Sequence, residues 1–536
     1  MDSCHGVTLE EATTDQLQDY MRQGILSSVK IVECYLRRKL QVDQYLNSIL
    51  ELNPDVMEIA ASLDALRANG IVLSPLHGIP FVVKDNIATQ DKMETTAGSY
   101  TLMGSVVPRD AHVVKKLREA GAILLGKAGM SEWADMRSNY YSEGYSARGG
   151  QVRTPYNLSS NPGGSSSGSG SAVGANLVMF SLGTETDGSI ISPAESSSLV
   201  GIKPTVGLTS RSGIIPESIH QDTVGPLART VRDATYALEI MVGIDERDNY
   251  TAAQQVPAGG YTQFLSGKGA LQGAVFGLPW ESFWTLAEQW MVDELLEVLD
   301  LIEDAGGTIV NGTELPHWQT IVSPAGWDWD YGTTRGYPNE SEYTVVKVDF
   351  YNNIKTYLSE LKNTDIRSLE DIVAYNNLYT GSEGGIPNTH PAFQSGQDGF
   401  LASLKTKGEM DETYWQALEF CQRTTREEGI DAALTWKGKK LDGLLVPSSV
   451  DQTYQIAAQA GYPMITLPVG LTPQNTPFGL SIMNTAWSEP SLVKYGSAIE
   501  DMFLQSQPSP TTGLKRGRTL PMFHEHLARN IPVRYQ

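Results

Sequence analysis

Small hydroxyl-bearing residues and glycines are concentrated in one stretch of the chain, residues 161–195. A Gly/Ser run occupies residues 163–171, and a second polar turn, residues 183–192, holds Ser189 directly after a glycine. Acyl transfer needs a nucleophilic hydroxyl together with backbone N–H groups that are aimed at the oxyanion it creates. Two small-residue loops on either side of one buried element could supply both, so this stretch predicts acyl-transfer chemistry.

The same stretch has two other interpretations. A Gly/Ser run often behaves as a flexible linker, but this run leads directly into the apolar residues 172–182, which we expect to form a buried helix or strand. A glycine-rich loop before a buried element can also hold phosphate. Neither a GxGxxG pattern nor a complete P-loop pattern is present, so phosphate binding ranks below acyl transfer.

Lys84 is the first charged residue after an apolar strand that we predict at residues 79–83, and Asp85 and Asn86 follow it directly. Taken alone, such a lysine usually marks the point where a strand reaches solvent. Its position in the pattern therefore does not by itself assign it any chemistry.

Helix-like and strand-like segments surround the serine-rich stretch and give the chain α/β character. Residues 1–70 are predicted as an N-terminal helical layer, with helix caps at Thr14 and at Ser27 or Ser28. Further strands are expected at residues 122–127, 441–447 and 464–469, and further helices at residues 111–120, 230–242, 287–305 and 491–503.

Residues 245–440 differ in composition from the rest of the chain. Six of the ten tryptophans lie within residues 245–345, namely Trp280, Trp284, Trp290, Trp318, Trp327 and Trp329. Aromatic-rich irregular segments usually form core, and they also suit substrate pockets. We therefore expect this variable region to contribute to a substrate pocket.

The overall charge and composition exclude several classes of partner. A net charge of −22 repels phosphate backbones, so no nucleic acid is expected to bind. No apolar run approaches the roughly 20 residues of a membrane helix, and no signal peptide is recognised. The sequence therefore predicts no association with a membrane and a cytoplasmic location.

The cysteines and histidines give no recognisable metal or disulfide pattern. Cys4, Cys34 and Cys421 form neither a disulfide framework nor a CxxC spacing, which fits a reducing compartment. His524 and His526 resemble a metal-binding pair but have no third ligand nearby in the sequence. We therefore predict that the protein holds no metal.

Three separated motifs give the sequence a specific resemblance. They are HGIPFVVKDN around Lys84, NPGGSSSGS around Ser165 and GTETDGSIISPA around Ser189, and the two serines are 24 positions apart. In order and spacing these motifs resemble those of the amidase signature hydrolases. The resemblance extends from about residue 10 to about residue 505, is weakest over residues 245–440, and is strongest to peptide amidases and related fungal and bacterial amidases.

The resemblance implies a fold and an activity. The expected fold is a central twisted mixed β-sheet covered by α-helices on both faces, in a single domain over residues 1–536. The expected reaction is hydrolysis of a carboxylic amide, from a small molecule or a peptide, to an acid and ammonia or an amine. No organic cofactor is implied, and the sequence does not specify the oligomeric state.

The resemblance also implies the roles of three residues. Ser189 would be the nucleophile that forms an acyl-enzyme, Ser165 the bridging serine that follows a cis Gly164–Ser165 bond, and Lys84 the base. A lysine accepts a proton only when it is neutral, and its ordinary pKa is about 10.4. We therefore expect burial to lower the pKa of Lys84.

The remaining site residues are expected around the oxyanion and the acyl group. Backbone N–H groups of Thr186, Asp187, Gly188 and Ser189 would stabilise the oxyanion, and the backbone near Ala134 would line the acyl side of the pocket. Many members of the family have glycine where this chain has Asp187. We expect its side chain to be tolerated because it points away from the reacting atoms.

Three alternatives remain open. Ser189 could pair with His220 in a conventional triad, although His220 follows a turn and is better explained as a structural or pocket-lining residue. A subunit of a glutamine-dependent tRNA amidotransferase shares the signature, but it would need a partner and an ammonia tunnel. A catalytically inactive binding protein is disfavoured because all three catalytic positions are occupied by the expected residue types.

Overall fold

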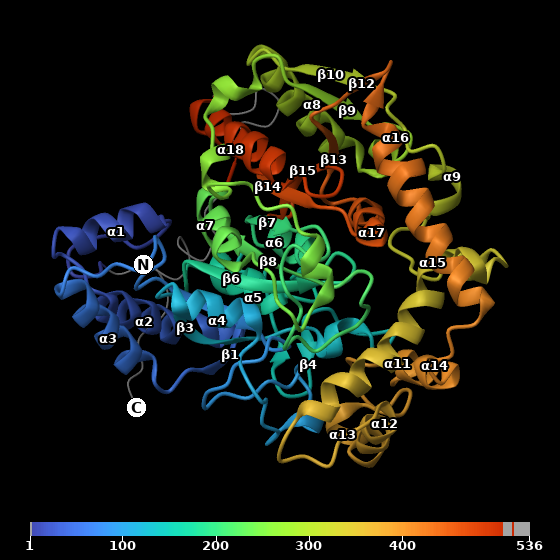
Figure 1. Cartoon of the computed structure of the whole chain (residues 1–536), viewed down its shortest axis with the longest axis horizontal. Coiled ribbons are helices and arrows are strands. Elements are labelled where there is room, and N and C mark those ends of the chain that lie inside the picture. Colours follow the sequence, from blue (N-terminus) through green and yellow to red (C-terminus); the bar gives the residue numbers. More distant parts are fainter. Residues whose placement is uncertain (1–2, 507–516, 519–536) are drawn as a thin grey trace.

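A mixed 11-stranded β-sheet runs through the centre of the molecule (Figure 1). The computed structural model describes residues 3–506 and 517–518. In sheet order the strands are β1 (Ile49–Leu52), β3 (Ile123–Ala128), β2 (Pro80–Lys84), β6 (Phe180–Glu185), β8 (Thr223–Ala228), β7 (Val200–Lys203), β14 (Met464–Leu471), β15 (Pro477–Met483), β13 (Gly443–Pro447), β9 (Val275–Leu278) and β10 (Thr308–Asn311).

Strand β2 lies between two parallel neighbours, β3 and β6. Val83 of β2 is opposite Lys127 of β3 on one side and opposite Leu182 of β6 on the other. Because parallel strands end at the same edge of a sheet, the residues that follow β2 and β6 meet there. This edge brings Lys84 close to the serine-rich segments that flank β6.

Helices surround the sheet, and those of residues 342–425 form a separate group at one side of Figure 1. Their bounds are α1 (Thr14–Arg22), α2 (Ser28–Leu46), α3 (Val56–Ala68), α4 (His112–Glu119), α5 (Ser167–Gly174), α6 (Ile191–Ser196), α7 (Val231–Met241), α8 (Gln289–Asp304), α9 (Trp318–Ile321), α10 (Tyr331–Thr334), α11 (Glu342–Glu360), α12 (Leu369–Leu378), α13 (Thr380–Glu383), α14 (Asp398–Thr406), α15 (Glu412–Thr425), α16 (Asp431–Ala433), α17 (Asp451–Ala460) and α18 (Glu489–Gln505). Two short hairpins pair β4 (Tyr145–Ser146) with β5 (Gly150–Gln151) and β11 (Thr435–Trp436) with β12 (Lys439–Lys440).

Apolar side chains cover both faces of the sheet. Successive residues of a strand point to opposite faces, and along β2 Phe81 and Val83 belong to one apolar cluster whereas Val82 belongs to another. The first cluster includes Leu117 of α4, and the second includes Leu63 of α3. This arrangement confirms the predicted α/β fold with helices on both faces.

The Gly/Ser run is ordered and buried, so the flexible-linker interpretation is excluded. Part of it forms α5, in which every residue is buried. A Cβ at Gly168 would lie 2.4 Å from the carbonyl oxygen of Ser48. The small residues therefore allow a helix to pack directly against neighbouring backbone, and the apolar stretch at residues 172–182 divides into the end of α5 and the start of β6.

The N-terminal layer departs from the sequence prediction in two details. It contains β1, which pairs with β3 at the edge of the sheet, so the layer is not purely helical. The side chain of Thr13, not Thr14, caps α1 through the N–H of Gln16, whereas Ser27 caps α2 as expected. Short edge strands such as β1 carry little periodicity, which explains why the sequence did not reveal it.

The prediction of no disulfide is wrong. Cys4 and Cys34 are joined, with an S–S distance of 2.11 Å, and Cys421 is a free, buried thiol. Cys4 lies in the segment before α1 and Cys34 lies in α2, so only the folding of that segment onto the helix brings them together. The expectation of a reducing compartment, which rested on the cysteine pattern, loses its basis. His524 and His526 lie outside the described residues.

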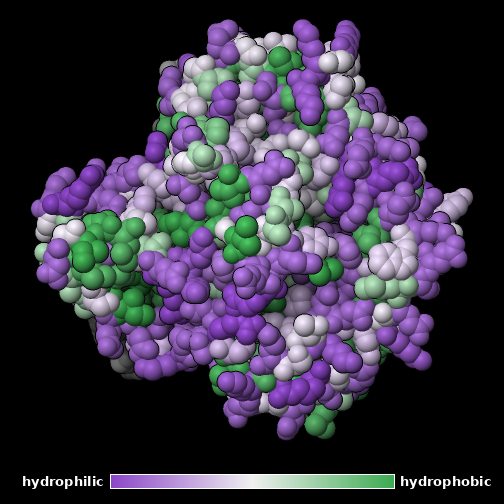
Figure 2. All heavy atoms as spheres, in the orientation of Figure 1, coloured by the Kyte–Doolittle hydropathy of each residue, from purple (hydrophilic) through white to green (hydrophobic). Residues whose placement is uncertain are grey.

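The surface is mainly hydrophilic, as the acidic composition predicts (Figure 2). In this view the broadest apolar patch lies over the N-terminal helices. Among the residues that the structure describes, no helix has both the length and the apolar character needed to cross a membrane.

Candidate active site

A tight turn between β6 and α6 presents Ser189 to a cavity. Glu185, the last residue of β6, accepts hydrogen bonds from the N–H groups of the two residues after Ser189 (2.7 and 3.0 Å), which ties the start of α6 to the strand. Gly188 has a φ of +79°, and a Cβ there would lie 2.4 Å from the ring of Tyr454. Position 188 therefore requires glycine, and the turn holds Ser189 with 5% of its surface exposed.

Ser165 lies two residues before α5, at the start of the buried Gly/Ser segment. The Gly164–Ser165 peptide bond is cis, which confirms the prediction. A Cβ at Gly164 would lie 1.7 Å from a carboxylate oxygen of Glu143, so a side chain there would have to displace that carboxylate. The carbonyl of Ser165 accepts a hydrogen bond from the N–H of Ser131 (3.1 Å). These contacts fix the position of the Ser165 hydroxyl.

A continuous chain of hydrogen bonds joins the three residues that carry the sequence motifs. Nζ of Lys84 lies 2.8 Å from Oγ of Ser165, and Oγ of Ser165 lies 2.9 Å from Oγ of Ser189. Nζ of Lys84 also donates to the carbonyl of Thr184 (3.2 Å). Residues that are 81 and 24 positions apart therefore meet because β2 and β6 are neighbours.

The Lys84 amine is removed from water, which changes its acidity. Burial lowers its pKa from 10.5 to about 8, while the carboxyls of Glu217, Asp135 and Glu143 favour the charged form and act in the opposite direction. Desolvation is the largest cause, as expected from the apolar strand. A useful fraction of the amine is therefore neutral near neutral pH and able to accept a proton.

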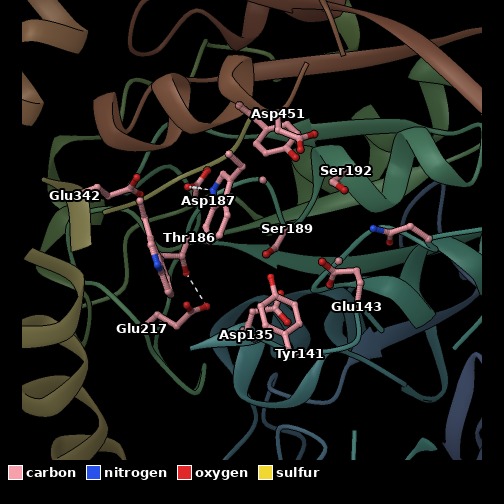
Figure 3. Close-up of a pocket in the computed structure, with 17 residues that line it drawn as sticks. Asp135, Tyr141, Glu143, Thr186, Asp187, Ser189, Ser192, Glu217, Glu342 and Asp451 are labelled. Atoms are coloured by element: carbon pink, nitrogen blue, oxygen red, sulfur yellow. Dashed lines mark hydrogen bonds between the residues drawn. The ribbon is translucent and has the colours of Figure 1, made fainter. Parts of the chain in front are cut away.

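The cavity beside Ser189 has a volume of about 150 Å³ (Figure 3). Lys84 and Ser165 are fully buried, are not among the residues that line it, and are joined to it through Ser189. The other predicted site residues all line it, namely Ala134, Thr186, Asp187, Gly188 and Ser189. The further lining residues are Asp135, Tyr141, Glu143, Asn161, Gly164, Ser192, Glu217, Trp327, Trp329, Glu342, Asp451 and Tyr454.

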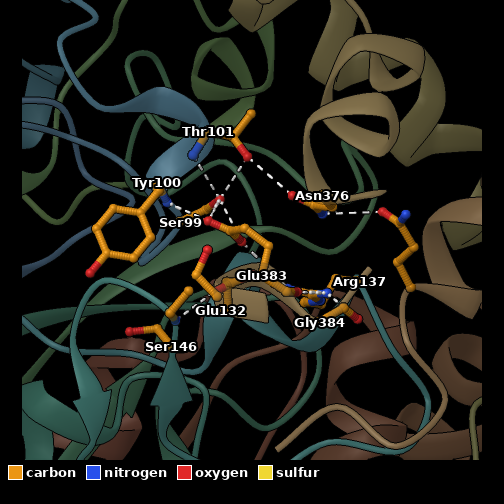
Figure 4. A network of polar contacts seen from close by, with 12 residues as sticks. Ser99, Tyr100, Thr101, Glu132, Arg137, Ser146, Asn376, Glu383 and Gly384 are labelled. Carbon is orange, nitrogen blue, oxygen red and sulfur yellow. Dashed lines mark hydrogen bonds and ion pairs between the residues drawn. The ribbon is translucent and has the colours of Figure 1, made fainter. Parts of the chain in front are cut away.

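Ala134 lies in a loop that is held by a buried ion-pair network (Figure 4). Residues 133–135 all adopt left-handed backbone conformations, with φ between +53° and +80°. Two residues later, Arg137 donates to the carboxylate of Glu132 and lies 3.7 Å from the carboxylate of Glu383 in α13. Glu383 in turn accepts a hydrogen bond from the N–H of Tyr100 (2.8 Å). The network thus fixes this wall of the cavity to the helices after residue 368.

Asp187 is held by partners outside the catalytic turn, which explains how its side chain is accommodated. Nε1 of Trp327 donates to the Asp187 carboxylate. Figure 3 shows the Asp187 carboxylate directed away from Ser189. Burial and the neighbouring Glu342 raise the pKa of Asp187 well above its ordinary value. Glu342 itself accepts hydrogen bonds from three glutamine side chains, Gln221, Gln455 and Gln459 (2.7 to 3.0 Å).

His220 lies in a different environment from the three motif residues. Its Nδ1 is 2.7 Å from a carboxylate oxygen of Asp349, and His220 is not among the residues that line the cavity. Among the described residues, one group has the composition to hold a metal ion: Cys4, His5 and Cys34. Two of these three side chains form the disulfide.

Sequence reasoning missed most of the acidic residues of the cavity. Asp135 directly follows Ala134, and Trp327 lies in the tryptophan-rich segment that we expected to form a pocket. Glu143, Glu217 and Glu342 gave no signal, because an isolated acidic residue in a loop or at the start of a helix is ordinarily exposed.

Comparisons with known proteins agree with this geometry. A family model described as Amidase matches residues 30–370. A protein of Schizosaccharomyces pombe that carries the name of an amidase is 60% identical over 99% of this chain and 90% of its own length. An Arabidopsis thaliana protein with a similar name is 39% identical over 94% of this chain and 92% of its own length.

A solved amidase structure has a similar fold. The X-ray structure of the native peptide amidase from Stenotrophomonas maltophilia superimposes with a TM-score of 0.82 at 36% identity, covering 96% of this chain and 99% of that one. The chain therefore belongs to the amidase signature family and is an amide hydrolase.

Proposed function

We propose that the protein hydrolyses a carboxylic amide through an acyl-enzyme on Ser189, with Ser165 as the bridging serine and Lys84 as the base. The observation that carries this proposal is the unbroken contact from the Lys84 amine to Ser165 (2.8 Å) and on to Ser189 (2.9 Å). Ser-Lys arrangements are a known substitute for the Ser-His-Asp triad.

The first step is attack on the amide carbonyl. Neutral Lys84 accepts the proton of the Ser165 hydroxyl while Ser165 accepts the proton of Ser189, so that the Ser189 oxygen bonds to the carbonyl carbon. The same path then returns one proton to the nitrogen as the C–N bond breaks and ammonia or an amine leaves. Water repeats the sequence on the ester and releases the acid.

Backbone N–H groups of residues 186–189 stabilise the oxyanion in this proposal. Among the hydrogen bonds of the described residues, none is donated by the N–H of Asp187 or of Ser189, so both remain available for a ligand. Loss of one such donor typically costs about 3–4 kcal/mol of transition-state stabilisation. Ala134, which lines the same cavity, is the expected neighbour of the acyl group.

Covalent labelling tests the nucleophile directly. A fluorophosphonate should modify Ser189, as read by mass spectrometry of the digested protein, and the Ser189→Ala variant should remain unlabelled. Release of ammonia from simple amides, without ATP or a second protein, separates a hydrolase from the amidotransferase alternative. Labelling at another serine, or ammonia release that survives in Ser189→Ala, would contradict the proposal.

Peptide C-terminal amides and amino-acid amides are the first substrates to test. The solved neighbour is named a peptide amidase, and the cavity includes Trp327 and Trp329 from the variable region. A panel of aliphatic amides, aryl amides, amino-acid amides and peptide amides, compared by kcat/KM, identifies the class that this cavity prefers.

A further inference from the structure

Carboxylic acids dominate the lining of the Ser189 cavity. Six of its 17 lining residues are acidic, namely Asp135, Glu143, Asp187, Glu217, Glu342 and Asp451. None of the 17, all of them described by the structure, is lysine, arginine or histidine. Lys84 lies behind the two serines and carries a positive charge only when it is protonated, which is its inactive form. The cavity therefore offers carboxyl oxygens and no cationic side chain to an entering substrate. Burial raises the pKa of Asp135, Glu143 and Glu217, so a bound cation is what would favour their ionised form.

The carboxyls of the cavity differ in how fully their oxygens are partnered. Glu342 accepts three glutamine donors (2.7 to 3.0 Å), and Oδ2 of Asp187 accepts the Trp327 N–H. Oδ1 of Asp187 and Oδ1 of Asp135 are both buried and have no hydrogen-bond partner among the described residues. An unpartnered buried acceptor is costly, so both carboxyls have capacity for a further donor, and Asp135 is the one that directly follows Ala134.

Two further carboxyls lie close to Asp135. Glu143 accepts a hydrogen bond from Ser131 (2.5 Å), and Glu217 accepts one from Thr186 (2.9 Å). Burial is the main cause that raises the pKa of Asp135, and the negative charges of Glu143 and Glu217 raise it further. Three ionised carboxylates this close together would repel one another, and a bound cation would relieve that repulsion.

Aromatic rings add a second attraction for a cation. Tyr141 lies beside Asp135 and Glu143 in Figure 3, and Trp327 and Trp329 line the same cavity. The faces of such rings attract ammonium groups. Carboxylates and aromatic faces around one small space are the combination that binds an ammonium ion.

We propose that the substrate of this amidase carries an ammonium group on its acyl part, bound by Asp135, Glu143 and Glu217. The inference rests on the proposed function. The acyl part is the relevant one because Asp135 directly follows Ala134, where the acyl group is expected. A volume of about 150 Å³ is close to that of engineered cavities that hold benzene, so the substrate is a compact amino amide, such as a small α-amino-acid amide.

Isosteric substrates test the proposal with the unaltered enzyme. Alaninamide and 2-methylpropanamide have the same shape, and at neutral pH the first carries an ammonium group where the second carries a methyl group. We expect kcat/KM for alaninamide to exceed that for 2-methylpropanamide by about 10- to 100-fold, since a hydrogen bond to a charged group contributes about 1.5–3 kcal/mol. Succinamate, which is anionic, should be the poorest of the three.

Two variants locate the effect. Asp135→Asn and Glu217→Gln should each lower the ratio of the two kcat/KM values by about tenfold. Glu119→Gln is the matched control, because it removes one carboxylate from an exposed position on α4 and should leave the ratio unchanged. If one of the two cavity variants fails to fold, the comparison of substrates with the unaltered enzyme and the ratio measured for the other variant still test the proposal.

The outcomes separate this inference from the function on which it rests. Equal or faster hydrolysis of 2-methylpropanamide or succinamate would overturn the ammonium proposal and leave the amidase mechanism intact. A preference for alaninamide that persists in both cavity variants would assign the cation to a different part of the site and overturn the role of these carboxyls. Absence of hydrolysis with every amide, together with failure of Ser189 to react with a fluorophosphonate, would instead contradict the proposed function.

Discussion

Two buried lysines on neighbouring strands have similarly lowered pKa values but different surroundings. Lys84 in β2 and Lys127 in β3 are both fully buried (0% exposed), and burial lowers the pKa of each to about 8. Lys127 donates to the carbonyl of Ile87 (2.5 Å) and the hydroxyl of Thr95 (2.8 Å). Lys84 instead reaches the Ser165 hydroxyl, which touches Ser189.

The comparison shows that a lowered pKa does not by itself identify a base. Perturbed acidity occurs in structural networks as well as in active sites. A third lysine, Lys203, also has its pKa lowered to about 8 by burial, yet its amine donates to the carbonyl of Tyr462 (2.7 Å). What distinguishes Lys84 is contact with a hydroxyl that can pass a proton onward.

Replacing each lysine by methionine should separate the two roles. Lys84→Met removes the base and should lower kcat by about 10²- to 10⁴-fold, the range that general base catalysis supplies. Lys127→Met leaves two buried acceptors without their donor and should cost about 1–3 kcal/mol of stability with a much smaller effect on kcat. Steady-state kinetics and thermal unfolding measure both quantities. Equal losses of kcat in the two folded variants would refute the distinction.

The serines of the same segment provide the next contrast. Ser165→Ala breaks the path between Lys84 and the nucleophile, and kcat should fall by about 10²-fold or more because proton transfer loses its intermediate. Ser169, on α5, donates to the carbonyl of Leu182 (2.9 Å) and has no contact with the lysine. Ser169→Ala should therefore retain activity and lose only part of its stability. Single-turnover acylation rates would show whether the loss in Ser165→Ala lies in the chemical step.

The pH dependence should report the Lys84 amine. The base acts only when neutral, so with a non-titrating substrate such as 2-methylpropanamide kcat/KM should rise with pH, reach a plateau above about 8, and fall about tenfold per pH unit below it. Lys127→Met should keep this limb unchanged. Glu217 faces Lys84 and also has its pKa raised to about 8, so the profile of Glu217→Gln is the control. A limb that disappears in Glu217→Gln would assign the titration to the carboxyl.

The sequence predicted those site residues whose role depends on their immediate neighbours along the chain. Gly188 lies in a left-handed turn, and a side chain at Gly164 would meet the Glu143 carboxylate, and both positions are glycines within recognisable motifs. The need for a neutral base predicted the burial of Lys84 and the direction of its pKa shift.

The remainder depends on tertiary contacts that leave no local pattern. Three glutamines from two other segments donate hydrogen bonds to the Glu342 carboxylate and hold it at the cavity. No residue spacing in the sequence predicts these contacts. Cys4 and Cys34 likewise come together only when the N-terminal segment packs on α2. The motifs therefore predicted the reacting residues, whereas most of the residues that line the cavity could be identified only from the structure.

Replacement of His220 should have the smallest effect on kcat/KM, and it tests whether Lys84 or His220 is the base. Like Lys84, His220 is a basic side chain with a close polar partner, since its Nδ1 lies 2.7 Å from Asp349, but no contact joins it to Ser189 among the described residues. Asp349 keeps hydrogen bonds from the hydroxyls of Ser218 (2.6 Å) and Tyr414 (2.8 Å) if the imidazole is removed.

His220→Ala should therefore lower stability by about 1–3 kcal/mol and change kcat/KM by less than about threefold, as judged from thermal unfolding and initial rates on the same preparation. His220→Gln, which retains a polar side chain, should recover part of the stability. A residue that does not contact the nucleophile should not lower kcat as strongly as loss of the base does. A loss of kcat in either variant comparable to that of Lys84→Met would therefore favour the Ser-His triad.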